Sequence, residues 1–265
     1  MHPIIFQAGS FTIYSYGVLV ATGVLVGVWL SANDAPRLGL SPLKIWNLGI
    51  YGILFALVTS KLWLILSSWS YYGANPREMF SIATLQSGGT FYGGFAGGIV
   101  WTIFYTRKEK MPLLPTLDVC AAPLALGHAI GRVGCFMAGC CFGKPTTLPW
   151  AVTFTSDIAA RISGTPLNLP LHPTQLYEAA AEFLNFLILY LIGRRWRFPG
   201  QIVGAYLILY GVERGLLEFL RDDPGRTPLW NGALSLMQLV SLAMICGGIF
   251  LWSRGLRDAK PATAS

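Results

Sequence analysis

The amino-acid sequence predicts an all-α polytopic membrane protein with seven transmembrane helices, an N-terminus outside the cell and a cytoplasmic C-terminus. Of its 265 residues, 54% are hydrophobic and only 12% are charged, and the mean hydropathy is +0.54. Soluble domains contain about 25% charged residues, so most of this surface must face lipid. The 9 Trp and 11 Tyr residues are typical of rings that lie at the two bilayer interfaces.

Seven apolar segments are long enough to cross a bilayer core, which needs about 20 residues per helix. In chain order they cover residues 12–32, 46–68, 89–106, 114–137, 174–193, 201–220 and 233–253. The first follows a start without the basic region of a cleavable signal peptide. The fourth and sixth have weaker hydropathy because each contains an arginine. We expect one seven-helix domain over 1–256, with an extracytoplasmic loop at about 138–173, and a disordered tail over 257–265.

The distribution of Lys and Arg between the connections predicts the orientation of the chain, because cytoplasmic loops carry an excess of these residues. One side receives Arg37, Lys44, Arg107, Lys108, Lys110, Arg194, Arg195, Arg197, Arg254, Arg257 and Lys260. The other side receives Arg77, Lys144, Arg161, Arg221 and Arg226. The N-terminus is therefore expected outside. The net charge of +7 is spread in small clusters beside apolar segments, so we expect contact with membrane lipid and no nucleic-acid partner.

Glycine pairs recur in the third apolar segment, SGGTFYGGFAGGIVW. Small residues four positions apart let two helices approach closely within lipid. We interpret Gly94 and Gly98 as a packing face of this helix rather than as part of a ligand site.

Two segments carry polar residues on one face of an otherwise apolar helix, judged at the 3.6-residue period. The fifth segment aligns Gln175, Glu178, Glu182 and Asn185. The sixth aligns Tyr206, Tyr210, Glu213, Arg214, Glu218 and Arg221. Arg214 and Glu218 are four residues apart, a spacing at which opposite charges pair along a helix. The two polar faces would satisfy each other if these helices lay against one another.

Arg132 and Arg214 are candidate functional residues, because a charged side chain inside a membrane is costly. Each lies near the outer end of its segment. One interpretation is a buried ion-pair network that only fixes helix packing. The excess of arginine instead favours a phosphate ligand, since one guanidinium binds two phosphate oxygens at once. In a membrane the abundant phosphate is that of a phospholipid headgroup.

The five cysteines allow several interpretations. Cys120 and Cys246 lie in apolar runs and are expected to be small core residues. Cys135, Cys140 and Cys141 form a C-x4-C-C pattern without a nearby histidine, whereas zinc sites usually present a closer pair with a second pair or histidines. From this spacing we predict no metal site. A disulfide from Cys135 to one of the other two is an alternative to free thiols outside the cytoplasm, and a nucleophilic thiol is another.

Six stretches of the chain match one known family, in the family's own order. They are HPIIFQAGSFTIYSYG, SGGTFYGGFAGG, GRVGCFMAGCCFGKP, HPTQLYEA, YGVERGLLEFLRDD and GALSLMQLVSLAM. In these stretches the chain resembles the prolipoprotein diacylglyceryl transferases of bacterial plasma (inner) membranes. The resemblance implies transfer of the sn-1,2-diacylglyceryl group of phosphatidylglycerol to the lipobox cysteine of preprolipoprotein signal peptides. A thioether forms, glycerol phosphate leaves, and we expect no metal or soluble cofactor.

The resemblance also implies roles for individual residues. Arg132 and Arg214 match the family's essential arginines, which are expected to hold the phosphate and its developing charge. Tyr16 matches a tyrosine of the first span, and Gly143 matches a glycine of the long motif. The other residues expected to bind substrate are Lys61, Cys135, His172, Gln175, Glu178, Glu218 and Arg221, with Glu218 and Arg221 as supporting acid and base.

The chain departs from the family at several positions. Tyr92 stands where many members have a histidine that has been regarded as the base for the substrate thiol, and a tyrosine of pKa about 10 is a poor base. Cys135 and Cys140 replace an asparagine and an acidic residue, and Lys61 replaces an arginine. We expect Tyr16 and Tyr92 to position the lipid glycerol or to relay a proton.

Two other functions compete with this one. The arginines could hold an anionic lipid in a non-catalytic binding or transport protein. Alternatively, Cys135, Cys140 and Cys141 could carry the chemistry of a thiol-redox membrane protein.

Overall fold

The structure is a computed structural model that describes residues 3–8, 11–81, 84, 89–222, 228–229 and 234–259. The described chain is mostly helical, as predicted. It divides into two compact units: the first contains Met1–Leu30 and Leu117–Ser265, and the second contains Ser31–Thr116. The predicted topology residues Arg226 and Lys260, and residues 260–265 of the predicted tail, lie outside the described part.

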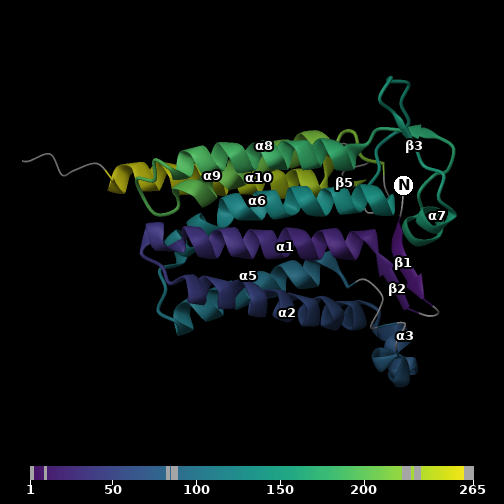
Figure 1. Cartoon of the computed structure of the whole chain (residues 1–265), viewed down its shortest axis with the longest axis horizontal. Coiled ribbons are helices and arrows are strands. Elements are labelled where there is room, and N and C mark those ends of the chain that lie inside the picture. The colour runs from purple at the N-terminus through teal and green to yellow at the C-terminus, as the bar shows by residue number, and fades with distance from the viewer. Residues whose placement is uncertain are drawn as a thin grey trace, which may run out of the picture. The chain divides into compact units, whose positions relative to one another are not determined.

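A long helix occupies every one of the seven predicted segments, with bounds that differ by a few residues (Figure 1). The helices are α1 (Ser15–Asp34), α2 (Pro42–Ser67), α5 (Phe91–Lys108), α6 (Leu113–Ala138), α8 (Thr174–Gly193), α9 (Gln201–Leu217) and α10 (Leu236–Asp258). Within the described residues, five stretches are long and apolar enough to cross a membrane: Ser15–Leu38, Pro42–Ser67, Leu113–Ala138, Thr174–Gly193 and Leu236–Asp258. These five support a multi-pass membrane protein. Crossing by α5 and α9 stays a prediction.

Helix α2 illustrates why the surface belongs in lipid. Leu54, Leu57 and Leu62 are each more than half exposed. Exposing such side chains to water costs roughly 25 cal/mol per Å² of apolar surface, and contiguous apolar surface of this kind marks an interaction site. A hydrocarbon environment removes this cost.

Short strands at the N-terminus correct the expectation that the first helix begins at residue 12. Strand β1 (Ile4–Ala8) pairs antiparallel with β2 (Phe11–Tyr14), and α1 begins only at Ser15. Residues 11–14 are aromatic or β-branched, which favours a strand over a helix. The all-α expectation therefore holds for the long elements but not for the whole chain. Two more strand pairs are β3 (Val152–Thr153) with β4 (Pro170–Leu171), and β5 (Pro228–Leu229) with β6 (Leu234–Ser235).

The predicted loop at 138–173 has its own folded core. Helix α7 (Asp157–Ser163) begins after Ser156, whose side chain accepts a hydrogen bond from the Ala159 backbone. Phe142, Phe154 and Leu171 are buried together. The loop is therefore a structured cap on the ends of α6 and α8 (Figure 1). The remaining described elements are η1 (Ala35–Leu38), α3 (Trp69–Ala74) and η2 (Pro76–Phe80).

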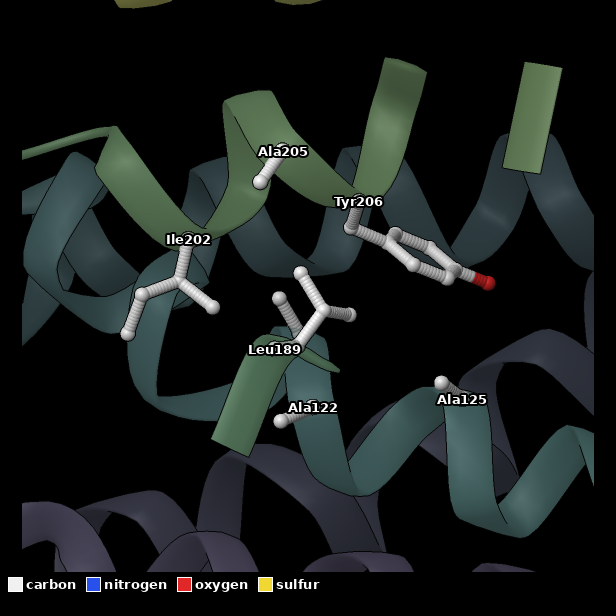
Figure 2. Close-up of a cluster of buried hydrophobic side chains, with 7 residues drawn as sticks. Ala122, Ala125, Leu189, Ile202, Ala205 and Tyr206 are labelled. Atoms are coloured by element: carbon white, nitrogen blue, oxygen red, sulfur yellow. The ribbon is translucent and has the colours of Figure 1, made fainter. Parts of the chain in front are cut away.

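In the first unit, helices α6, α8 and α9 share an apolar core. Figure 2 shows the side chains that meet there, namely Ala122 and Ala125 of α6, Leu189 of α8, and Ile202, Ala205 and Tyr206 of α9. The alanines allow close approach of the helices around Leu189, as small residues do in membrane bundles. This core fixes α8 and α9 against α6 next to their polar faces.

A buried carboxylate ties α6 to the start of α9. Asp118 Oδ1 accepts hydrogen bonds from the backbone of Ile202 and Val203, and its Oδ2 accepts from Gly200 and from the Trp196 indole. The first N–H groups of a helix lack partners within the helix, and an acidic group stabilises that positive end. Asp118 therefore anchors the start of α9 to α6.

Helices α1 and α6 approach so closely that glycine is required at their crossing. A Cβ atom on Gly23 would lie 2.4 Å from the Gly127 carbonyl oxygen, and one on Gly127 would lie 2.7 Å from the Gly23 oxygen. No side chain larger than hydrogen fits there. This contact brings the start of α1 alongside α6 (Figure 1).

The second unit is built on α2 packed against α5, and it corrects the predicted glycine face. A Cβ on Gly93 or Gly97 would collide with Trp63 or Thr59 of α2. A Cβ on Gly94 would make only ordinary contact, and one on Gly98 would meet nothing within 4 Å. The glycine pairs give two sets spaced four residues apart, Gly93 with Gly97 and Gly94 with Gly98. The spacing alone could not show which set faces α2.

Candidate functional site

Buried polar residues form a continuous cluster where α6, α8 and α9 meet in the first unit. On α8, the predicted polar face is buried in full, comprising Gln175, Glu178, Glu182 and Asn185. On α9, Tyr206, Glu213 and Arg214 are buried. The two faces meet as expected, because Asn185 donates to Glu213 at 2.6 Å and the Tyr206 hydroxyl donates to Glu182 at 3.5 Å. They satisfy each other only in part, since Glu182 Oε2 and Glu213 Oε1 have no hydrogen-bond partner among the described residues.

Arg132 enters this cluster from α6 and pairs with the carboxylate of Glu178. Its Nη2 lies 2.5 Å from Glu178 Oε1. One turn earlier on the same helix face, His128 Nδ1 lies 2.6 Å from Glu182 Oε1, and His128 Nε2 lies 3.7 Å from Glu178 Oε1. The two glutamates therefore hold a histidine and an arginine in fixed positions, as a buried charge requires.

Arg214 lies on α9 and forms the predicted ion pair with Glu218. Its Nη2 lies 2.7 Å from Glu218 Oε2, and both side chains are almost fully buried. Helix α9 ends at Leu217, so the predicted helix over 201–220 is too long at this end. Arg221 consequently lies beyond the helix, in an isolated β-bridge with Gly143.

Both guanidinium groups retain a buried nitrogen without a hydrogen-bond acceptor among the described residues. These atoms are Arg132 Nε and Arg214 Nη1. A buried donor without a partner costs about 1–3 kcal/mol. The charges of both arginines also act on the Tyr210 hydroxyl, so the two side chains serve one region of the cluster. Two guanidinium groups that act on the same residue and have unused hydrogen-bond donors can bind an anion with several oxygens.

The sulfur atoms of Cys135, Cys140 and Cys141 lie within 4.8 Å of one another beside Arg132. Arg132 Nη1 donates to Cys135 Sγ at 3.7 Å. All three cysteines are free thiols, so the predicted alternative of a disulfide is not adopted. Hydrogen bonds with Cys135, and to a lesser extent with Cys140, lower the pKa of the Cys141 thiol. The charges of Arg132 and Arg221 add to this effect.

Gly143 joins the loop to the helices at a point with no room for a side chain. Its N–H donates to the His172 carbonyl at 3.1 Å. A Cβ at this position would lie 2.7 Å from the side chains of His172 and Thr174 and 2.8 Å from the Leu220 carbonyl oxygen. The His172 ring lies 3.3 Å from the Tyr177 hydroxyl. His172 is thus part of the segment that holds the loop on α8.

Tyr16 belongs to the same unit as the two arginines. It lies in the first turn of α1, where its backbone would be 3.4–3.5 Å from a Cβ on Gly134. The charges of Arg132 and of the three clustered cysteines reach its hydroxyl. Its ring is 44% exposed, so a lipid substrate can reach it.

Tyr92 and Lys61 lie in the second unit. Tyr92 is in the first turn of α5 and its ring is about half exposed. Lys61 Nζ, on α2, donates to the Thr84 carbonyl at 2.7 Å. Both side chains remain candidates on the strength of the resemblance alone.

The sequence interpretation missed the part that His128 plays. Its ring bridges Glu178 and Glu182, a role that the sequence analysis did not assign to it. A signal was present, because His128 lies four residues before Arg132 and therefore on the same helix face. Tyr210 was on the predicted polar face, but its closeness to both arginines could not be read from the sequence.

Comparison with known proteins finds relatives along almost the whole chain. The family model described as prolipoprotein diacylglyceryl transferase matches residues 3–254. A protein of Clostridium tetani named phosphatidylglycerol--prolipoprotein diacylglyceryl transferase is 35% identical over 254 residues, covering 96% of this chain and 97% of that protein. A protein of the same name from Finegoldia magna is 34% identical, covering 95% of this chain and 94% of that protein. Another from Synechococcus elongatus is 33% identical, covering 98% of this chain and 90% of that protein.

Proposed function

The chain belongs to the prolipoprotein diacylglyceryl transferase family, and on this basis we propose how its site carries out the family's reaction. The protein is a transferase that moves the sn-1,2-diacylglyceryl group of phosphatidylglycerol to a cysteine thiol of a prolipoprotein. The products are a thioether-linked lipoprotein precursor and glycerol phosphate. This is the first step of lipoprotein maturation.

The observation that carries the proposed mechanism is the pair of incompletely satisfied guanidinium groups. Arg132 and Arg214 are held by Glu178 and Glu218, yet each keeps a buried nitrogen that no described residue accepts from. A phosphate diester supplies the missing oxygens, and a guanidinium binds such oxygens in a forked geometry. The phosphate of phosphatidylglycerol is therefore the ligand that we propose for these two side chains.

The chemical step is a substitution at the glycerol carbon that bears the phosphate. The thiol of the acceptor cysteine loses its proton to water at the membrane surface, and its sulfur forms a new bond to this carbon while the bond from carbon to phosphate oxygen breaks. The leaving glycerol phosphate carries away the electron pair and becomes more negatively charged. Arg132 and Arg214 stabilise that growing charge, because fixed cations in a site of low dielectric favour the transition state over the bound lipid.

The surrounding residues support these two side chains. Glu178 and Glu218 hold the guanidinium groups, Gln175 donates to the Cys140 carbonyl, and Gly143 with Arg221 closes the loop over the cluster. His172 anchors that loop. Tyr16, in the same unit, orients the lipid glycerol or relays a proton, whereas roles for Tyr92 and Lys61 of the second unit rest on the family resemblance alone.

The second substrate and the cellular setting follow from the proposed reaction. The acceptor is the lipobox cysteine of a preprolipoprotein signal peptide, which reaches the enzyme from the bilayer of the bacterial plasma (inner) membrane. We place the site at the outer end of seven membrane spans, with the N-terminus outside and the C-terminus in the cytoplasm.

A transfer assay with purified protein tests this function. Phosphatidylglycerol and a lipobox peptide should yield a peptide heavier by one diacylglyceryl group, and a peptide with serine in place of cysteine should yield none. Arg132→Ala should lower the rate at least about a hundredfold, while Arg161→Ala, on the exposed side of α7, should not. If the protein bound phosphatidylglycerol tightly but formed no thioether, it would be a lipid-binding protein instead.

A further inference from the structure

The group of Cys135, Cys140 and Cys141 has a geometry that its sequence spacing did not predict. From the C-x4-C-C pattern we expected no metal site. The fold nevertheless places the three sulfur atoms within 4.8 Å of one another. Three sulfurs bound to one zinc ion at 2.3 Å lie about 3.8 Å apart, so a small closure of side-chain torsions would complete such a site.

Cys141 has a backbone conformation that residues with a side chain rarely adopt. Cys141 has a φ of +60° and Gly139 has a φ of +81°. A non-glycine residue in this region persists only where its surroundings fix it. Two side chains of the first turn of α8 do so, because Thr174 Oγ1 donates to the Cys141 carbonyl at 2.8 Å and Gln175 Nε2 donates to the Cys140 carbonyl at 2.7 Å. These two hydrogen bonds fix the segment that carries Cys140 and Cys141 against the start of α8.

A guanidinium group lies next to the cysteines, because Arg132 Nη1 donates to Cys135 Sγ at 3.7 Å. Three thiolates around a divalent cation carry a net negative charge, which the neighbouring guanidinium groups can balance. Thiolates select soft or borderline cations such as Zn²⁺ over Mg²⁺ or Ca²⁺.

We propose that Cys135, Cys140 and Cys141 bind one Zn²⁺ ion and that its fourth coordination position receives the acceptor thiol. Within the described residues the cluster contains no fourth protein ligand. Three protein ligands with an open position characterise catalytic rather than structural zinc sites. The inference rests on the proposed transferase function and assigns the activation of the thiol to this cluster.

The step is balanced without an oxidant or a reductant. The acceptor thiol binds zinc as a thiolate and releases its proton to water at the membrane surface, as a coordinating thiol does. The zinc-bound sulfur then forms the bond to the glycerol carbon held beside Arg132, and glycerol phosphate leaves with the electron pair of the broken carbon–oxygen bond. The neutral thioether is a weak ligand and departs from the zinc.

Metal binding can be measured without any transferase activity. The full chain, purified in detergent and stripped with a chelator, should bind one Zn²⁺ per chain. It should also bind Co²⁺ with the intense near-ultraviolet charge-transfer band of cobalt–thiolate bonds. Cys141→Ser and Cys140→Ser should each weaken binding by about a hundredfold or more, while Cys246→Ser on α10 should bind as the unaltered chain does. Circular dichroism of each variant checks that the helices are intact.

The open position is tested with a lipobox peptide and its serine counterpart. The cysteine peptide should intensify the cobalt–thiolate band and the serine peptide should not. Chelation should lower the rate of thioether formation by about a hundredfold, and Zn²⁺ should restore it. Full transferase activity in metal-free protein would overturn the inference while leaving the proposed function intact. If the peptide thiol bound the metal but no thioether formed, the proposed function would be wrong and the metal site would stand. A disulfide among the three cysteines, or failure to bind either metal, would also overturn the inference.

Discussion

At the scale of single residues, the site depends on guanidinium groups that the protein fixes in place and leaves partly unsatisfied. Arg214 gives one nitrogen to Glu218 and keeps another buried without an acceptor among the described side chains. Arg214→Lys keeps the positive charge but loses the planar fork that binds two phosphate oxygens. We expect the rate of diacylglyceryl transfer to fall about a hundredfold or more, with the helical content of the purified variant unchanged.

A matched arginine-to-lysine substitution elsewhere separates the loss of the planar guanidinium fork from a general effect of replacing arginine by lysine. Arg161→Lys changes an exposed side chain on α7 and should leave the rate within about twofold, since surface substitutions are usually near neutral. If Arg214→Lys transferred lipid at the unaltered rate, a point charge would suffice and forked recognition of phosphate would be the wrong account.

The sequence identified most of this residue-level site because helical periodicity is a local property. Gln175, Glu178, Glu182 and Asn185 follow the period of a helix, and all are buried as predicted. The pairing of His128 with Glu182 joins residues 54 positions apart. Only the packing of α6 against α8 brings them together, so the spacing of residues could not reveal it.

At the scale of elements, one tight contact joins the loop after α6 to the start of α8 and the end of α9. Gly143 sits where a Cβ would meet His172, Thr174 and the Leu220 carbonyl at 2.7–2.8 Å. Because the carbonyl belongs to the backbone, Gly143→Ala must shift a whole segment. We expect a loss of about 1–3 kcal/mol in the free energy of unfolding and a lower transfer rate, measured by denaturant titration and by the peptide assay.

Gly98→Ala is the control for this prediction. A Cβ at Gly98 of α5 would meet nothing within 4 Å, and alanine is favoured over glycine inside a helix by roughly 0.5–1 kcal/mol. Stability should therefore stay the same or rise. Equal stability of both alanine variants would show that the loop can move aside at Gly143, and that the close packing there is not required.

Element boundaries were less predictable than the elements themselves. Residues 11–14 read as the start of an apolar span, yet they pair with Ile4–Ala8 because a partner strand lies just before them. Arg221 fits the polar face of α9 by periodicity, but the helix ends at Leu217 and Arg221 bridges to Gly143 instead. In both cases the choice is made by a neighbouring segment rather than by the residues in question.

At the scale of the whole molecule, helix length and loop charge give different indications of the number of membrane crossings. Five described stretches satisfy length and composition, whereas α5 and α9 have 18 and 17 residues and are about 27 and 26 Å long. A bilayer core is about 30 Å thick. If these two helices did not cross, the chain would pass through the membrane only five times.

The charges of the connections favour seven crossings. With five crossings and the N-terminus outside, the basic connections at 107–110 and 194–197 would both lie outside. Each Lys or Arg near the anionic cytoplasmic surface is worth about 1 kcal/mol, so that arrangement would place six favourable charges on the wrong side. Local thinning of the bilayer around a short helix costs only fractions of a kcal/mol per Å of mismatch. The charge effect is therefore the larger one.

Reporter fusions distinguish the two arrangements, because they place the loop at 138–173 on opposite sides. With seven crossings, alkaline phosphatase fused after Leu148 should be active outside the cytoplasm, and green fluorescent protein fused after Arg197 should fluoresce inside it. With five crossings both results reverse, while a fusion at the C-terminus stays cytoplasmic in either case and serves as the expression control. An inactive phosphatase at Leu148 would place the Arg132 region at the cytoplasmic surface and require acceptor proteins to be modified there, before their export.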